Sequence, residues 1–109
     1  MSIYIGSWEF QGPFTTTMDL LHEPGIYAIL SGKEDQIELM EIDETESIRG
    51  SIENHPWYHL PRYGNGGSLA VAVYYCPDLT DGLRAGLVEQ LLAEFHCNRY
   101  EPNLNRLSS

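Results

Sequence analysis

The chain has 109 residues, 42% of them hydrophobic and 20% charged, a composition typical of one globular domain with a single core. Sixteen acidic residues and six basic residues give a formal net charge of -10. The basic residues stand singly along the chain. This argues against a polyanionic ligand, because nucleic-acid affinity depends on clustered Lys and Arg.

Residues 1–23 predict one strand and one short helix ahead of the core. Apolar side chains at Ile3, Ile5, Trp8 and Phe10 favour a strand that adds to a sheet edge and ends at Gly12-Pro13. Thr residues at 15–17 can cap a short helix. The segment has neither a basic stretch nor the roughly 18 apolar residues of a membrane span. We therefore expect a cytoplasmic protein without a signal peptide or a membrane partner.

Two apolar runs, Gly25 to Leu30 and Gln36 to Ile42, predict a β-hairpin closed by a loop that contains Gly32. Strict alternation in the second run places Leu39 and Glu41 on one face, with Met40 and Ile42 on the other. A capping box formed by Asp43 and Glu46 predicts a helix over 46–54, which Pro56 stops.

The run Ser68 to Cys76 is apolar on both faces, which predicts a strand in the middle of the sheet. From Asp81 the spacing becomes helical, with a stripe made of Leu83, Leu87, Val88, Leu91, Leu92 and Phe95. The only two cysteines, Cys76 and Cys97, are expected to be reduced and largely buried. The pattern as a whole predicts an α/β (α+β) domain: a central, mainly antiparallel sheet of three core strands plus an N-terminal edge strand, flanked by helices.

The order strand, turn, strand, helix, strand, helix over roughly residues 24–105 resembles the GIY-YIG nuclease domain. Gly25-Ile26-Tyr27 matches the first motif of that family letter for letter. The resemblance implies one domain over 1–109 with a small sandwich fold. It also implies that active members hydrolyse a DNA phosphodiester with one divalent metal, Mg²⁺ or Mn²⁺.

The resemblance makes Tyr27, Arg49, His55 and Glu89 the candidate site residues. It makes Tyr27 the catalytic tyrosine, Glu89 the metal-binding carboxylate and His55 a basic residue at a helix end. Glu41-Ile42-Asp43 stands where the family has its second motif, so that Glu41 replaces a tyrosine. The family arginine falls at Ser51, which cannot stabilise an anion. Arg49 lies two residues before Ser51, and two residues turn the face of a helix by about 200°.

Each of these residues also has a structural interpretation. Tyr27 in an apolar strand is consistent with a core tyrosine whose hydroxyl lies at the rim. Glu89 is consistent with a solvated helix residue, and Arg49 with a partner of Glu46 or Glu53. His55 and His59 have metal-ligand spacing, but Pro56 interrupts the helix between them, and we expect no zinc site there.

Two functional hypotheses follow. In the first, the domain has lost catalysis and binds a basic protein through its acidic surface and aromatic residues at Trp57, Tyr58 and Tyr63, as an immunity protein, antitoxin or nucleic-acid mimic does. In the second, it is a metal-dependent DNA endonuclease in which Arg49, Arg62 or His55 replaces the missing arginine.

Overall fold

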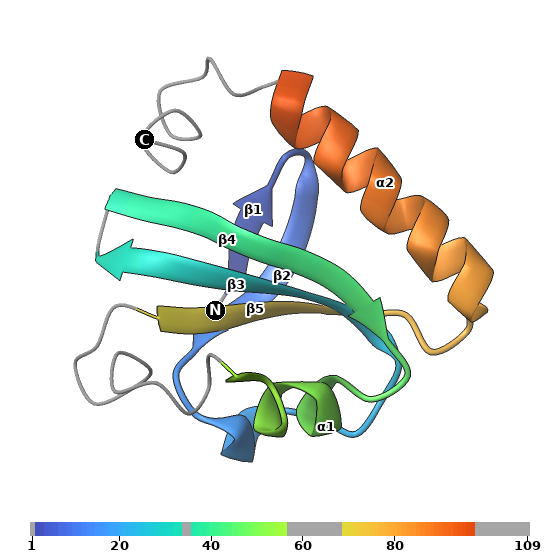
Figure 1. The fold of residues 1–109 in the computed structure, drawn as a ribbon, viewed down its shortest axis with the longest axis horizontal. Coiled ribbons are helices and arrows are strands. Elements are labelled where there is room, and N and C mark those ends of the chain that lie inside the picture. The colour runs from blue at the N-terminus through green and yellow to red at the C-terminus, as the bar shows by residue number, and fades with distance from the viewer. Residues whose placement is uncertain (1, 34–35, 57–68, 98–109) are drawn as a thin grey trace.

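The computed structural model describes residues 2–33, 36–56 and 69–97, and these form one antiparallel sheet covered on both faces (Figure 1). The five strands of this part of the chain have the spatial order β1-β2-β5-β3-β4. Their bounds are β1 Ser2–Ile5, β2 Trp8–Phe14, β3 Gly25–Lys33, β4 Gln36–Thr45 and β5 Leu69–Tyr75. The predicted α+β class, a small sheet flanked by helices, is confirmed.

The two faces of the sheet carry different helices. Helix α1 (Ile48–Glu53) and the 3-10 turn η1 (Thr17–Asp19) cover one face, and helix α2 (Asp81–Cys97) crosses the other. Successive side chains of β3 point alternately into the two cores, one on each face of the sheet. Ile26 and Ala28 point into the core under α2, while Tyr27 and Ile29 point into the core under α1. We call these sides the α2 face and the α1 face.

Strand β5 lies in the interior of the sheet, as its apolar faces predict. It pairs with β2 on one side and with β3 on the other. Val71 and Val73 are fully buried on the α1 face, and Ala72 is fully buried on the α2 face. A strand that is covered on both sides needs apolar residues at consecutive positions, which explains the run in the sequence.

The N-terminal region is a hairpin rather than the single strand predicted. Strands β1 and β2 pair from Ser2 with Gln11 to Ile5 with Trp8. The turn between them contains Gly6, whose φ of 62° is left-handed and favours glycine. Gly12 and Pro13 do not end the strand. They lie inside β2, where the register against β5 shifts between Gln11 and Phe14.

An irregularity in β4 overturns the predicted faces of that strand. Ile29 pairs with Glu41 but Leu30 pairs with Leu39, so Met40 is an extra residue in the ladder. Leu39 and Ile42 consequently both pack into the α2-face core. Glu41 follows Ile29 onto the α1 face. The strict alternation assumed for the sequence fails because this bulge reverses the pattern after Leu39.

Helix α1 begins later than predicted. Pairing with β3 keeps the chain extended through Thr45, so Asp43 lies opposite Tyr27 in the sheet and caps nothing. The N-cap is Ser47, whose hydroxyl accepts a hydrogen bond from the Gly50 amide at 3.2 Å. The predicted Asp43–Glu46 capping box is therefore wrong, and the helix spans Ile48–Glu53 rather than 46–54.

Two other local predictions, a short helix capped by threonine and a free buried Cys76, are confirmed. Thr16 caps η1 by accepting from the Met18 amide at 3.2 Å, in agreement with a short helix after the threonines. Cys76 is a free, buried thiol, as predicted. The side chain of Cys97 lies outside the described ones. Over the described ranges the structure contains no helix with the length and apolar character needed to cross a membrane.

Candidate functional site

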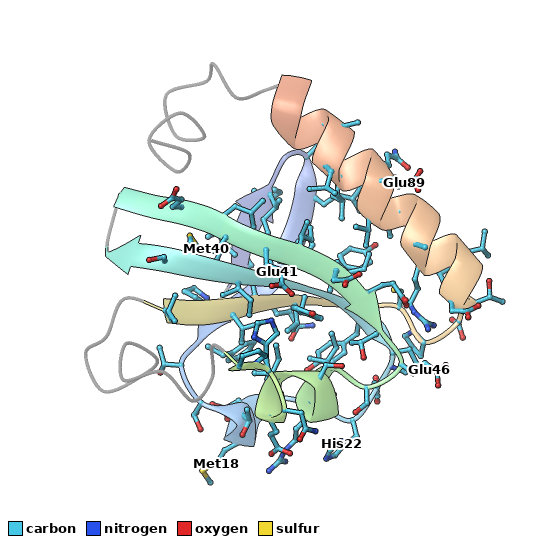
Figure 2. All side chains as sticks on the ribbon, in the orientation of Figure 1. Met18, His22, Met40, Glu41, Glu46 and Glu89 are labelled. Carbon is cyan, nitrogen blue, oxygen red and sulfur yellow. The ribbon has the colours of Figure 1, made fainter. Side chains whose placement is uncertain are left out.

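Three residues from separate segments meet on the α1 face of the sheet. The Tyr27 hydroxyl on β3 donates to Glu41 Oε2 on β4 at 3.0 Å. His55, which follows α1, places its Nε2 3.0 Å from the same oxygen. The rings of Tyr27 and His55 meet edge to face, with centroids 6.0 Å apart. We call Tyr27, Glu41 and His55 the tyrosine–glutamate–histidine cluster; Figure 2 labels Glu41 where it leaves β4.

Local structure explains why the three side chains converge. Glu41 lies opposite Ile29, two residues along β3 from Tyr27, and the Met40 bulge turns it to the α1 face. Helix α1 packs on the same face through Ile48 and Ile52, which are fully buried. His55, two residues after the end of this short helix, therefore lies next to Glu41.

The cluster is closed on one side and open on the other. The side chain of His55 is 10% exposed, whereas that of Glu41 is 35% exposed. Tyr27 is buried, and burial together with the hydrogen bond to Glu41 raises its pKa above the ordinary value near 10. A tyrosine that accepts a proton in catalysis must first lose its own. The environment of Tyr27 opposes that loss.

Ser51 and Arg49, the two helix residues considered for an arginine role in the sequence, are both hydrogen-bonded within the fold. Ser51 exchanges a hydrogen bond with the hydroxyl of Thr45 at the end of β4. Arg49 Nε donates to Glu53 Oε2 at 3.0 Å, which selects Glu53 from the two predicted partners. The same carboxylate accepts a bond from the Thr17 hydroxyl at 3.2 Å. Glu53 thus joins α1 to η1 through Thr17, and Arg49 Nε bonds this carboxylate within α1 rather than Glu41.

Glu89 does not join the cluster. It is exposed on α2, where its neighbour Val88 packs into the α2-face core. Figure 2 shows Glu89 on the outer side of α2, with the sheet between that helix and α1. Tyr27 and Glu89 therefore occupy opposite sides of the sheet. Among the described residues no three His, Cys, Asp or Glu side chains are grouped to hold a metal ion.

Sequence reasoning missed two features of these residues. It treated Glu41 only as the loss of a tyrosine, whereas the structure makes it the acceptor that joins Tyr27 to His55. The second feature is the burial of Arg84, which the predicted apolar stripe of α2 did not include. Arg84 is in fact 3% exposed, with Nε 2.8 Å from Glu44 Oε1 and an Nη atom 2.7 Å from the Leu79 carbonyl oxygen. Spacing of four from Val88, a buried stripe residue, was the available signal for Arg84.

Several predicted features fall outside the described residues. These are the aromatic segment with Trp57, Tyr58 and Tyr63, together with His59 and Arg62. Comparison with protein-family models, with curated proteins and with solved structures found no match. The resemblance to the GIY-YIG domain accordingly stays a prediction from the sequence.

Proposed function

We propose that this protein is a divergent, catalytically impaired GIY-YIG-like domain that works as an acidic module binding a basic protein. The observation that carries the proposal is the distribution of charge. The two arginines whose side chains the structure describes, Arg49 and Arg84, each form a salt bridge with a carboxylate of the same chain. Many carboxylates outside these pairs are exposed: Glu9, Asp19, Glu23, Asp43, Glu46, Asp78, Asp81 and Glu89.

Such a surface attracts a cationic partner and repels a phosphate backbone. With a net charge of -10, long-range attraction raises the association rate with a basic protein and falls as salt is added. The same negative field would repel the phosphate backbone of a nucleic acid. An antitoxin, an immunity protein or a nucleic-acid mimic uses this kind of surface to cover a basic site on its target.

The tyrosine–glutamate–histidine cluster supports the loss of catalysis. Phosphodiester cleavage requires a group that stabilises the developing negative charge. Where the resemblance places that arginine, Ser51 is bonded to Thr45, and the nearby Arg49 is paired with Glu53. Glu41 adds a carboxylate beside Tyr27, where a further anion is unfavourable. The endonuclease alternative therefore has no observation in its favour among the described residues.

The proposal is tested by identifying the partner and its salt dependence. The immobilised protein is used to capture partners, and each captured protein is purified and titrated against it in low and high salt. We expect a basic protein whose affinity falls with salt and which loses affinity for the double variant Asp43→Asn, Glu46→Gln, both at exposed positions. An acidic partner would contradict the proposal. An affinity that changes neither with salt concentration nor in the double variant would contradict it as well.

A further inference from the structure

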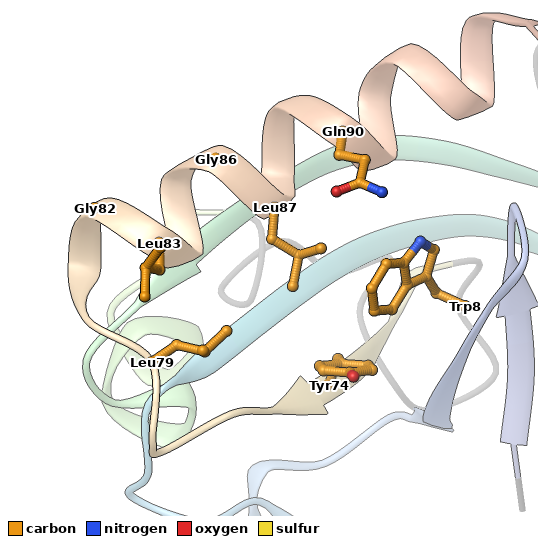
Figure 3. Close-up of a pocket in the computed structure, with 8 residues that line it drawn as sticks. All are labelled: Trp8, Tyr74, Leu79, Gly82, Leu83, Gly86, Leu87 and Gln90. Carbon is orange, nitrogen blue, oxygen red and sulfur yellow. The ribbon is translucent and has the colours of Figure 1, made fainter.

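An open apolar groove runs along the N-terminal half of α2, away from the tyrosine–glutamate–histidine cluster. Its volume is about 460 Å³. Trp8 and Tyr74 line it from the sheet, and Leu79, Leu83, Leu87 and Gln90 line it from α2 and the segment before it. Figure 3 shows Leu87 and Gln90 directed from α2 toward Trp8 and Tyr74.

Packed aromatic rings form the floor of the groove. Trp8 and Tyr74 form an edge-to-face pair with centroids 5.6 Å apart, and Tyr74 also contacts the buried ring of Phe10 at 5.6 Å. On the opposite wall, Leu83 is 60% exposed. Exposed leucine beside aromatic rings is the chemistry that a partner's apolar side chains desolvate on binding.

Two of the residues that line the groove on α2 are glycines, so no side chain projects into the groove at these positions. Gly82 and Gly86 are one turn apart on α2, and apart from its chain neighbours and the nearby helix backbone, a Cβ added at either would meet no atom of the described residues within 4 Å. Internal packing therefore does not require glycine at these positions, although glycine lowers helix propensity. Gly25 is different, because a Cβ there would lie 2.5 Å from the Tyr74 carbonyl oxygen. The open space at Gly82 and Gly86 is room for something outside the fold.

The charge around the groove selects its occupant. Exposed carboxylates of Asp78 and Asp81 stand beside Leu79 and Gly82 in the chain, and exposed Glu89 precedes Gln90. Among the residues that the structure describes, none of those lining the groove is cationic. A second copy of this chain would bring two net charges of -10 together, whereas a basic segment would find complementary charge.

The dimensions of the groove match a short stretch of helix. Gly82 to Gln90 covers eight helical steps, or about 12 Å, which is a little over two turns. An amphipathic helix presents apolar side chains at i, i+3 or i+4, and i+7 over about the same length.

From these observations we propose that the groove binds the apolar face of a basic amphipathic helix belonging to the partner. This inference rests on the proposed function, since it names the segment through which a basic protein would dock.

The test uses a defined probe: a fluorescein-labelled peptide of about 18 leucine and lysine residues arranged so that a helix has one apolar face. Its control has the same composition with leucine and lysine alternating, a pattern that matches a strand instead. We expect the helical peptide to bind at least about tenfold more tightly, measured by fluorescence anisotropy.

Paired variants locate the binding site. Gly86→Met fills the groove and should weaken binding of the helical peptide at least about tenfold, whereas Ala85→Met, at an exposed position outside the lining, should change it less than about twofold. Leu83→Ser should weaken binding as well. Leu21→Ser, at an exposed leucine outside the lining, should not. Circular dichroism confirms that each variant is folded.

The possible results distinguish a failure of the groove proposal from a failure of the proposed function. Unchanged binding in both Gly86→Met and Leu83→Ser would overturn the groove proposal while a salt-dependent basic partner still stood. Equal binding of the two peptides would also overturn it, because charge alone would then account for the affinity. If wild type binds neither a peptide nor a basic partner, the proposed function itself fails.

Discussion

The hydrogen bond between Tyr27 and Glu41 should be measurable as an energetic coupling between the two side chains. A hydrogen bond to a charged group contributes about 1.5–3 kcal/mol when it is well shielded. The Glu41 side chain is 35% exposed, so water replaces part of the lost interaction when Tyr27 is changed. We expect Tyr27→Phe to cost about 1–2 kcal/mol and Glu41→Ala, which also removes the His55 contact, about 2–3 kcal/mol.

The double variant should then be less destabilised than the sum of the single variants. We expect a coupling of about 1–1.5 kcal/mol, obtained from urea unfolding of all four proteins. The matched control is Tyr75→Phe. The Tyr75 hydroxyl also lies on the α1 face but bonds the Leu21 amide at 2.9 Å. Its cycle with Glu41→Ala should be additive within about 0.5 kcal/mol. Equal coupling in both cycles would refute the specific bond.

Three further predictions follow from the packing and the titration of the fold. Arg84→Met should destabilise the protein by about 2 kcal/mol in urea unfolding because it leaves Glu44 without its buried partner, and Glu44→Gln should cost less. Gly86→Ala should raise stability by up to about 1 kcal/mol, or roughly 4 °C in Tm by calorimetry, whereas Gly25→Ala should lower it by several times that amount because the β5 backbone must shift. Burial and the Glu41 bond raise the pKa of Tyr27 in the folded state, so its contribution to stability is complete below pH about 10 and is lost as pH rises from there. The stability of wild type should therefore fall more steeply above that pH than that of Tyr27→Phe, and equal slopes would contradict this.

Much of the fold could be predicted from patterns that extend over several residues. Strand β5 is apolar on both faces, and only a central position in the sheet satisfies that pattern. The hairpin of β3 and β4 carries an equally long signal. The apolar stripe predicted for α2 holds only in part, because Leu83 is 60% exposed whereas Arg84 is buried. Gly25 has a structural role, since the close approach of the Tyr74 carbonyl oxygen excludes a side chain there.

The parts that could not be predicted depend on single residues and on distant contacts. One extra residue at Met40 moves Glu41 to the other face of the sheet, and nothing in the local sequence marks that bulge. The helix start moved because pairing with β3 keeps Asp43 extended, a tertiary effect stronger than its capping preference. The link between Glu41 and His55 joins β4 to the end of α1 and so depends on both of these details.

The proposed loss of phosphodiester cleavage can be tested by a direct assay. Purified protein is incubated with supercoiled plasmid and with single-stranded DNA in the presence of Mg²⁺ or Mn²⁺, beside the variants His55→Ala and Glu89→Gln. We predict no cleavage above the buffer background for any of the three proteins, because Arg49 is paired with Glu53 and Glu89 lies on the other side of the sheet. Cleavage by the wild type that disappears in either variant would contradict the account.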